Sequence, residues 1–256
     1  MSNHLEQLLI KRAIVIPSYG EDLALPALLK TLAGSLSRED LIIVADDSKP
    51  EIKTRLVAGC ESAMKDSMGS LKFSFAETKS GRGAAVRRGM KLAKDEYPNL
   101  AFVMECDADG SHQPHDILRV RDSSIGCDLL VGSRYLRDSK IVGWPITRRI
   151  FSKLINVLIP LLLNLHMKDV TNGLRKYSIV AVDLILGSEA NSTGFIYLSE
   201  QALLISRSGL EIKEIPIVFI DRKLGASTVT WREIVSSILG ILKLVSSDFG
   251  SRLKRE

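Results

Sequence analysis

One short stretch decides the fold class of this chain: Phe102-Val-Met-Glu-Cys-Asp107-Ala-Asp109-Gly-Ser-His112. Its first five residues are mostly apolar or sulfur-bearing, which predicts a short buried strand that runs directly into two carboxylates. In α/β sheets, ligands bind at the carboxyl ends of the strands. An Asp-x-Asp pair at that place can hold a hard divalent cation, which can in turn hold a diphosphate. The alternative is an acidic turn that caps a helix starting near Pro114.

Strand–helix alternation surrounds this stretch. Apolar segments rich in β-branched residues predict strands at 13–16, 41–45, 71–75, 100–104 and 127–131, with helices at 23–36, 52–68 and 84–94 between them. This alternation is typical of a doubly wound, mostly parallel sheet. The sequence therefore predicts an α/β fold whose first half is a nucleotide-binding unit.

The second half is less regular. A polar, irregular segment begins at Gly132, residues 151–167 are strongly apolar, 169–176 read as a polar loop, and 211–220 predict another strand. From Trp231 to Ser247 the apolar residues recur at helical spacing, which predicts an amphipathic helix. The sequence shows no internal repeat and no low-complexity linker.

The composition indicates a globular protein with a large core. Of the 256 residues, 45% are apolar and 25% are charged, which suits one α/β domain with a small appendage. The 35 basic and 30 acidic residues give a net charge of +5. This excess fits an anionic substrate or an anionic membrane surface. Because aromatic residues make up only 5% of the chain, a base-stacking platform for nucleic acid is not supported.

The cysteines and the amino terminus indicate a reducing compartment. Cys60, Cys106 and Cys127 form neither a metal-binding spacing nor an even disulfide set, which fits a protein whose thiols stay reduced. The amino terminus lacks the apolar core of a signal peptide. Nowhere does the chain offer the run of about eighteen apolar residues that a membrane span requires. We therefore expect a cytoplasmic protein.

The apolar segment 151–167 has two interpretations. It is too polar to span a membrane, because Lys153, Asn156, Pro160 and Asn164 interrupt it. It is either a core helix that packs on the sheet or an interfacial amphipathic helix with leucines in the acyl layer. In the second case, lipid phosphates would meet the basic residues near its start: Arg148, Arg149 and Lys153.

Polar residues follow the first two predicted strands. After the first strand come Pro17, Tyr19 and Glu21. Glu21 either favours the start of the next helix through the helix dipole or accepts ribose hydroxyls. The second strand ends in Asp46 and Asp47, which repel each other unless something binds there. A carboxylate at this place can accept a pair of hydrogen bonds from a guanine or uracil edge.

A glycine-rich loop, Lys79-Ser-Gly81-Arg82-Gly83-Ala-Ala, follows the third predicted strand. Its small residues allow close backbone approach, and the N-terminus of the next helix offers free N–H groups to a phosphate. The loop matches neither a Walker loop nor a full dinucleotide-binding fingerprint. By itself it indicates a phosphate contact and nothing more specific.

A series of short motifs occurs in a definite order along the chain. The early ones are Ile16-Pro-Ser-Tyr-Gly-Glu, Val44-Ala-Asp-Asp-Ser, Gly81-Arg-Gly-Ala-Ala, Asp107-Ala-Asp-Gly-Ser-His and Val131-Gly-Ser-Arg-Tyr. The later ones are Trp144-Pro-Ile-Thr-Arg-Arg, Asp169-Val-Thr-Asn-Gly-Leu-Arg, Gly194-Phe-Ile-Tyr-Leu-Ser-Glu and the segment 214–227. In this order they resemble the family-2 inverting glycosyltransferases, and more narrowly the dolichol-phosphate (polyprenol-phosphate) mannosyltransferase group. The resemblance covers residues 11–235.

The resemblance implies a GT-A fold and a reaction. One domain, 1–235, would contain a nucleotide-sugar half at 11–133 and an acceptor half at 134–235, with an amphipathic helix and basic tail at 236–256. The enzyme would transfer a hexose, mannose from GDP-mannose, to a polyprenyl phosphate with inversion. Mg²⁺ or Mn²⁺ would be the cofactor, and the enzyme would be peripheral on the cytosolic face of a membrane or bound to a membrane-anchored partner subunit.

The resemblance also implies a role for particular residues. Asp107 and Asp109 would hold the metal. The nucleotide-sugar site would comprise Pro17, Tyr19, Glu21, Asp46, Asp47, Lys79, Gly81, Gly83, Asp107, Ala108, Arg222 and Ser227. The acceptor phosphate would be bound by Arg134, Arg148 and Arg149. The catalytic residues would be Asp109, Arg134, Arg148, Arg175 and Glu200. Arginine suits phosphate binding because its guanidinium is planar and always charged.

The acceptor decides whether a general base is needed. An acceptor phosphate is already an anion at neutral pH, so alignment and stabilisation of the departing nucleoside diphosphate would suffice. An acceptor hydroxyl would require a base, for which Glu200 is the candidate, unless it is merely a polar residue at a helix start. His112 either contacts phosphate or lies in a solvated loop.

Two positions depart from the pattern of the group. Many relatives carry a glutamine metal ligand where this chain has Ser111, and some carry a lysine near the diphosphate where it has Thr228. Both bear on metal affinity and rate. Two other functions stay open. One is transfer from a UDP-sugar to a saccharide hydroxyl, against which the arginines at 134–149 argue. The other, suggested by Ser111 and Thr228, is nucleotide-sugar binding by an inactive subunit.

Overall fold

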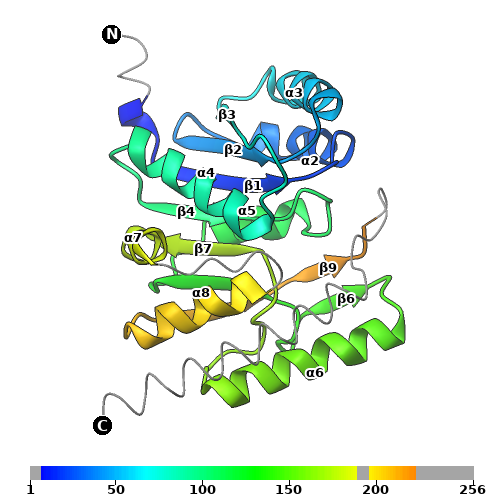
Figure 1. Ribbon diagram of the computed structural model, residues 1–256, viewed down its shortest axis with the longest axis vertical. Coiled ribbons are helices and arrows are strands. Elements are labelled where there is room, and N and C mark those ends of the chain that lie inside the picture. The colour runs from blue at the N-terminus through cyan, green and yellow to red at the C-terminus, as the bar shows by residue number, and fades with distance from the viewer. Residues whose placement is uncertain (1–6, 189–195, 223–256) are drawn as a thin grey trace.

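The computed structural model describes residues 7–188 and 196–222, and a seven-stranded sheet forms its centre (Figure 1). All neighbouring strands pair in parallel except β7, which is antiparallel to both of its neighbours. In spatial order the strands are β3 (Ser70–Phe75), β2 (Asp40–Asp46), β1 (Arg12–Ser18), β4 (Phe102–Glu105), β7 (Arg175–Ser178), β5 (Leu129–Ser133) and β8 (Ile212–Pro216).

Helices cover both faces of this sheet. They are α2 (Ala24–Leu32), α3 (Pro50–Met64), α4 (Arg82–Glu96), α5 (Pro114–Arg121), α6 (Ile146–Leu163), α7 (Ile179–Gly187) and α8 (Ile196–Arg207), and a 3-10 helix, η1, spans Ala33–Ser35. Because side chains alternate along a strand, neighbours on β1 serve opposite faces. Ile14 packs in the apolar cluster with α2, α3 and α5, whereas Val15 packs in the cluster with α4, α7 and α8. Burial on both faces explains why β1 and β2 are continuous apolar runs.

A second, two-stranded sheet lies beside the main one. It pairs β6 (Lys140–Val142) in parallel with β9 (Val218–Ile220). An isolated antiparallel bridge joins His112 to Phe219. The loop that follows β4 is thereby connected to the small sheet.

The five strands predicted in the first half are confirmed, with ends that differ by a few residues. The predicted loop 169–176 is wrong at its end, because Arg175 begins β7 in the middle of the sheet. β7 carries no apolar run, so its sequence does not predict a strand. The single strand predicted at 211–220 is two strands in two sheets, β8 and β9, separated at Ile217.

The fold confirms a mostly parallel α/β sheet. Strands from both predicted halves share this sheet, since β7 lies between β4 and β5, and β8 lies beside β5 at the edge. The predicted boundary near residue 134 stays a prediction. The predicted helix at Trp231–Ser247 lies outside the described residues.

Helix α6 exposes most of its apolar side chains, which contradicts the interpretation as a core helix, and binding at a membrane interface stays a prediction. It buries only Asn156, Ile159, Pro160 and Leu163. Its exposed apolar side chains, between 40% and 74% accessible, are Ile146, Ile150, Phe151, Leu154, Val157, Leu158, Leu161 and Leu162. In Figure 1 this helix runs along the edge of the molecule opposite to α3. Among the described residues, no helix has the length and apolar character needed to cross a membrane.

Candidate active site

The predicted acidic residues meet at the carboxyl ends of neighbouring parallel strands. Asp107 and Asp109 follow β4, and Glu21 follows β1, its parallel neighbour. The pKa of Glu21 is raised by burial and by the negative charges of Asp109 and Asp107. Three carboxylates therefore share one region, at the position where open α/β sheets bind ligands.

Asp107 is held by a guanidinium to which the sequence motifs assign no role. Arg82, at the start of α4, places Nη2 2.9 Å and Nε 3.2 Å from Asp107 Oδ1. Burial opposes ionisation of Asp107, but Arg82, with further contributions from His112 and Arg134, outweighs burial and lowers the pKa of Asp107 to about 2. One carboxylate oxygen of Asp107 is thus occupied within the protein.

Arg82 is itself held by a second carboxylate, that of Glu105 at the end of β4. Its Nη1 donates to Glu105 Oε2 at 2.6 Å, and the other oxygen of this fully buried carboxylate accepts from Tyr177 Oη at 2.5 Å. A Cβ at Gly173 would overlap the guanidinium and lie 2.8 Å from Asp107 Oδ1. Glycine at 173 therefore leaves the space in which Arg82 and Asp107 meet.

Asp109 lies at a tight turn. Gly110 has φ +74°, a conformation that glycine adopts without strain. The N–H of Ser111 donates to Asp109 Oδ1 at 3.0 Å, and Arg222 Nε lies 3.6 Å from Asp109 Oδ2. The turn orients Asp109 beside a cation that the family resemblance assigns to the nucleotide-sugar site.

The donor set suits a hard divalent cation only with help from a ligand. Among the described residues, no group of three or more His, Cys, Asp or Glu side chains is placed to hold a metal. Mg²⁺ is commonly bound through one or two carboxylates, substrate phosphates and waters. Asp107 and Asp109 fit that arrangement, so they could hold Mg²⁺ or Mn²⁺ together with a diphosphate.

Ser111 does not extend towards solvent. Its side chain is 1% exposed, and its Oγ has no hydrogen-bond partner among the described residues. A buried hydroxyl without a partner is uncommon in proteins. At the position where relatives carry glutamine, this chain therefore has a short side chain with an enclosed hydroxyl.

The adjacent carboxylates of Asp46 and Asp47 are satisfied inside the protein. Asp46 accepts from the backbone N–H and Oγ of Ser48. Asp47 accepts from the N–H groups of Ser80 and Gly81 and from Arg88 Nη2 at 2.8 Å. Their repulsion is relieved without a ligand, so the inference that it requires one is wrong. Contact of either residue with a nucleoside stays a prediction.

Asp47 also shapes the glycine-rich loop. Its carboxylate fixes the backbone at residues 80 and 81, where Gly81 has φ +89°. Lys79, just before, places Nζ 4.2 Å from the ring centroid of the exposed Tyr19. Loops 17–21 and 79–83 therefore meet near the acidic cluster. Gly83 and Ala108 are buried, and Pro17 is half-buried.

Arg134 and Arg148 both approach the ring of Trp144. Arg134 is buried and makes a bidentate pair with Asp169, with Nη2 2.7 Å from Oδ1. Arg148, at the start of α6, stacks 4.1 Å from the Trp144 centroid and lies 2.9 Å from Asp221 Oδ1. Arg134 lies 5.4 Å from the same ring. Both arginines are thus pre-positioned by carboxylates.

Arg175 differs from its predicted role. It is fully buried, and its guanidinium donates to the backbone carbonyls of Asn172, Leu198 and Val170. With these bonds it supports the segment before β7, and it does not point to an open phosphate site. Its sequence neighbourhood is polar, which explains why the sequence predicts a loop there.

The remaining predicted residues are spread around the site. Arg149 is exposed and donates to the carbonyl of Ile141. Glu200 is half-buried on α8, so its role as a base stays a prediction. Arg222 is the last described residue, and Ser227 and Thr228 lie outside the described part of the chain.

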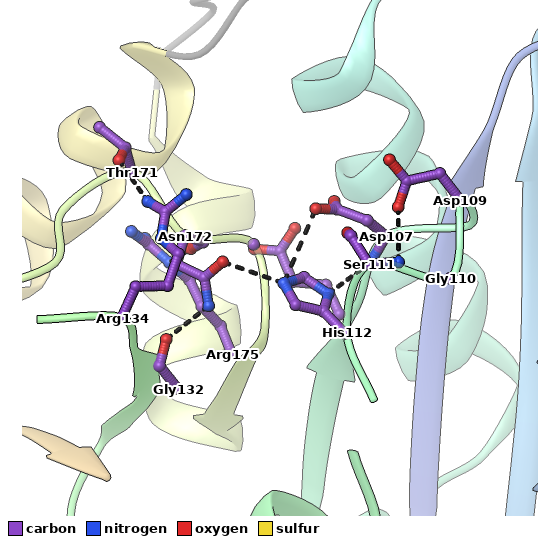
Figure 2. Close-up of polar contacts among 12 residues, drawn as sticks. Asp107, Asp109, Gly110, Ser111, His112, Gly132, Arg134, Thr171, Asn172 and Arg175 are labelled. Atoms are coloured by element: carbon purple, nitrogen blue, oxygen red, sulfur yellow. Dashed lines mark hydrogen bonds and ion pairs between the residues drawn. The ribbon is translucent and has the colours of Figure 1, made fainter. Parts of the chain in front are cut away.

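The sequence does not reveal a buried contact between a histidine and an asparagine. His112 is fully buried, which contradicts one of its two interpretations, a histidine in a solvated loop, whereas contact with a phosphate stays a prediction. Figure 2 shows His112 between Asp107 and Asn172, and Asn172 belongs to a segment 60 residues farther along the chain. Predicting this contact would have required knowing that β4 pairs in antiparallel with β7, and no apolar pattern in the sequence reveals that pairing.

Comparison with known proteins identifies a matching family and related sequences. The model of the family "Glycosyl transferase family 2" matches residues 13–183. An undecaprenyl-phosphate mannosyltransferase of Micrococcus luteus is 29% identical over 90% of this chain and 91% of its own length. A polyprenol monophosphomannose synthase of Mycolicibacterium smegmatis is 28% identical over 86% of this chain and 82% of its own.

A solved structure shares the fold. Glucosyl-3-phosphoglycerate synthase of Mycobacterium tuberculosis, in complex with Mn²⁺, UDP and glucosyl-3-phosphoglycerate, superposes with a TM-score of 0.62 at 16% identity. The match covers 97% of this chain and 83% of that protein. The α/β fold expected from the sequence is thereby confirmed.

Proposed function

This chain belongs to glycosyl transferase family 2, and we propose that it transfers mannose from GDP-mannose to a polyprenyl phosphate with inversion. It is a glycosyltransferase. The two relatives described above, one acting on undecaprenyl phosphate by name and one named a polyprenol monophosphomannose synthase, support the acceptor and the sugar. The donor nucleotide follows from the sequence resemblance.

One relationship supports the acceptor assignment most directly. Two consecutive residues connect the acceptor side to the metal-binding carboxylates: Asp221 pairs with Arg148, and Arg222 lies beside Asp109. Arg148 belongs to the first turn of α6, the helix with the exposed apolar face. A phosphate on a lipid chain could therefore reach cations next to the donor diphosphate while its chain leaves along α6.

The reaction is a direct displacement at the anomeric carbon. A phosphate oxygen of the acceptor forms the new bond, and the bond from the anomeric carbon to the diphosphate breaks on the opposite side. The acceptor phosphate is already anionic, so no residue needs to remove a proton. Arg148 and Arg222 would hold the phosphates in line, which lowers the entropic part of the barrier.

Asp107 and Asp109 would hold Mg²⁺ or Mn²⁺ against the diphosphate. The cation, when bound, neutralises negative charge that grows on the leaving group. Arg82 keeps Asp107 ionised and oriented for this purpose. Ser111 would contribute less than the glutamine of relatives, because its hydroxyl is short and enclosed.

The exposed face of α6 supports peripheral binding at the cytosolic face of a membrane. Apolar side chains line it, and Arg149 and Lys153 are exposed on the same helix. An apolar face and cations act together at a membrane with anionic lipids. A membrane-anchored partner subunit could serve the same purpose.

The test is transfer of radiolabel from GDP-mannose into organic-extractable lipid, with polyprenyl phosphate present. We expect product with Mn²⁺ and none after EDTA. A transfer that requires a UDP-sugar and a saccharide hydroxyl would replace this function by the alternative reaction. Nucleotide-sugar binding without any transfer would identify an inactive subunit.

A further inference from the structure

His112 sits at the centre of a buried hydrogen-bond chain. Its Nδ1 accepts from the backbone N–H of Asp107 at 3.1 Å, and its Nε2 lies 2.9 Å from Asn172 Oδ1. Asn172 is 2% exposed, and its Nδ2 donates to the carbonyl of Gly132 on β5. Figure 2 shows this chain running from β5 to the turn that holds Asp107 and Asp109.

The contacts admit one assignment of protons. The amide of Asn172 turns its oxygen to His112, because its nitrogen donates to Gly132. Nε2 of His112 must then carry a proton to meet that oxygen, and the nearest oxygen of the Asp107 carboxylate is farther away, at 3.8 Å. Nδ1 must be without a proton, because it accepts from the Asp107 N–H. His112 is therefore the neutral imidazole with its proton on Nε2.

The N–H of Asp107 depends on His112 for its partner. β4 ends at Glu105, so residue 107 lies beyond the described strand ladder. A buried N–H left without an acceptor costs free energy comparable to that of a hydrogen bond. The imidazole of His112 supplies the acceptor for this N–H. Because the ring is rigid, the hydrogen bond forms only when the turn holds one position.

Asn172 belongs to a segment that also holds the other charged groups. Asp169 and Thr171 bind Arg134, and the carbonyl of Gly173 lies 3.4 Å from Arg82 Nη2. Segment 169–173 thus contacts the acceptor-side arginine, the guanidinium on Asp107 and the turn itself. The same segment therefore positions His112, Arg134 and Arg82 relative to one another.

We propose that His112 is a positioning residue, which holds the Asp107–Asp109 turn against segment 169–173 as the neutral Nε2–H tautomer. The proposal rests on the proposed function in one respect, namely that this turn holds the divalent cation. His112 is fully buried, and its Nε2 lies 3.8 Å from Asp107 Oδ2. It acts through the backbone of Asp107.

Two near-isosteric variants separate its two bonds. In His112→Asn the side-chain oxygen lies near the position of Nδ1 and can accept from Asp107. In His112→Gln the amide reaches towards Asn172 but leaves the Asp107 N–H without an acceptor. His112→Ala removes both bonds. The control is His115→Ala, because the side chain of His115 is 67% exposed.

The first measurement is Mn²⁺ binding in the presence of GDP, by electron paramagnetic resonance. We expect affinity to fall about tenfold or more in His112→Ala and His112→Gln, the size of one buried hydrogen bond. His112→Asn should recover most of it, and His115→Ala should match wild type. The KM for polyprenyl phosphate should change less than the KM for metal. Equal affinity in all three His112 variants and wild type would overturn the proposal.

Two measurements need no metal. The ¹⁵N spectrum of the His112 ring should show the Nε2–H tautomer, and a proton on Nδ1 would contradict the assignment. Exchange of the Asp107 amide should be slow in wild type and His112→Asn and fast in His112→Gln. Similar exchange in the two variants would overturn the proposal, even if His112→Ala fails to fold. If wild type binds no Mn²⁺ with GDP, the metal assignment fails. The exchange rate of the Asp107 amide and the tautomer of the His112 ring would still test the positioning role of His112.

Discussion

Arg82 donates from two nitrogens to a single oxygen of Asp107, with Nη2 2.9 Å from Oδ1. The pair spans the glycine-rich loop and the end of β4, two segments to which the sequence assigns different ligands. It leaves Oδ2 as the oxygen of Asp107 that a cation would meet. The Arg82–Asp107 pair therefore links the glycine-rich loop directly to the proposed metal site.

This pair predicts a pH-dependent stability in the metal-free protein. The pKa of Asp107 is lowered to about 2, against about 3.9 in an unfolded chain. A lowered carboxyl pKa stabilises the fold above the unfolded value, and the contribution is lost as pH falls towards 2. Urea unfolding in EDTA should show this loss between about pH 4 and 2.

The double variant Arg82→Met/Glu105→Gln should weaken that dependence, since it removes the cation beside Asp107, while Glu105→Gln avoids leaving the fully buried Glu105 as an unpaired charge. The matched control is Lys91→Met/Asp95→Asn, an exposed pair at 2.8 Å. The control should keep the wild-type slope. An unchanged slope in the Arg82 variant would show that Asp107 is not stabilised by this guanidinium.

Asp109→Asn should reduce mannosyl transfer by at least about a hundredfold. Loss of one anionic ligand to a catalytic cation should cost several kcal/mol, and about 1.4 kcal/mol is tenfold in rate. Product in extracted lipid measures this, with the exposed Asp66→Asn as control. Near-full activity of Asp109→Asn in Mn²⁺ buffer would remove Asp109 from the metal site.

GDP-mannose should raise the melting temperature more than UDP-glucose at equal concentration. A ligand that binds only the folded state stabilises it by mass action, so the better ligand gives the larger shift. Differential scanning fluorimetry with Mn²⁺ present measures both shifts. A larger shift with UDP-glucose would favour the alternative donor.

The double variant Leu158→Asp/Leu162→Asp should abolish co-sedimentation with anionic liposomes and formation of lipid-linked product. Both side chains are exposed, at 40% and 50%, so the variant should fold. Its thermal shift with GDP-mannose should persist. The control Met68→Asp/Val180→Asp changes two apolar residues that are at least as exposed but lie outside α6. Liposome binding by the folded α6 variant would contradict docking through this face.

Arg175→Met should lower stability rather than act on catalysis alone. It would leave the carbonyls of Asn172, Leu198 and Val170 without their donor. Each buried unsatisfied group costs about 1–3 kcal/mol, so we expect a loss of about 3 kcal/mol or more. Urea unfolding measures it, with the exposed Arg38→Met as control. Wild-type stability with lost transfer would restore the predicted phosphate role.

The sequence predicts the parts of the fold that depend on neighbours along the chain. Strands β1 to β5 follow from apolar runs, and the acidic residues after β4 follow from where that run stops. The periodicity of residues 151–167 predicts a helix but does not predict whether that helix is exposed. Burial depends on what lies opposite a helix, which its own sequence does not contain.

The sequence by itself determined the α/β class, the strand-end carboxylates Asp107 and Asp109, and the family. These rest on local spacing, which is set by the geometry of single strands and helices. Only the tertiary structure decided which polar groups meet. The short strand β7 enters between β4 and β5 and brings Asn172 to His112 and Arg175 into the core. Hydrogen-bond partners 60 residues apart leave no period in the sequence, because their contact depends on how strands are ordered in the sheet.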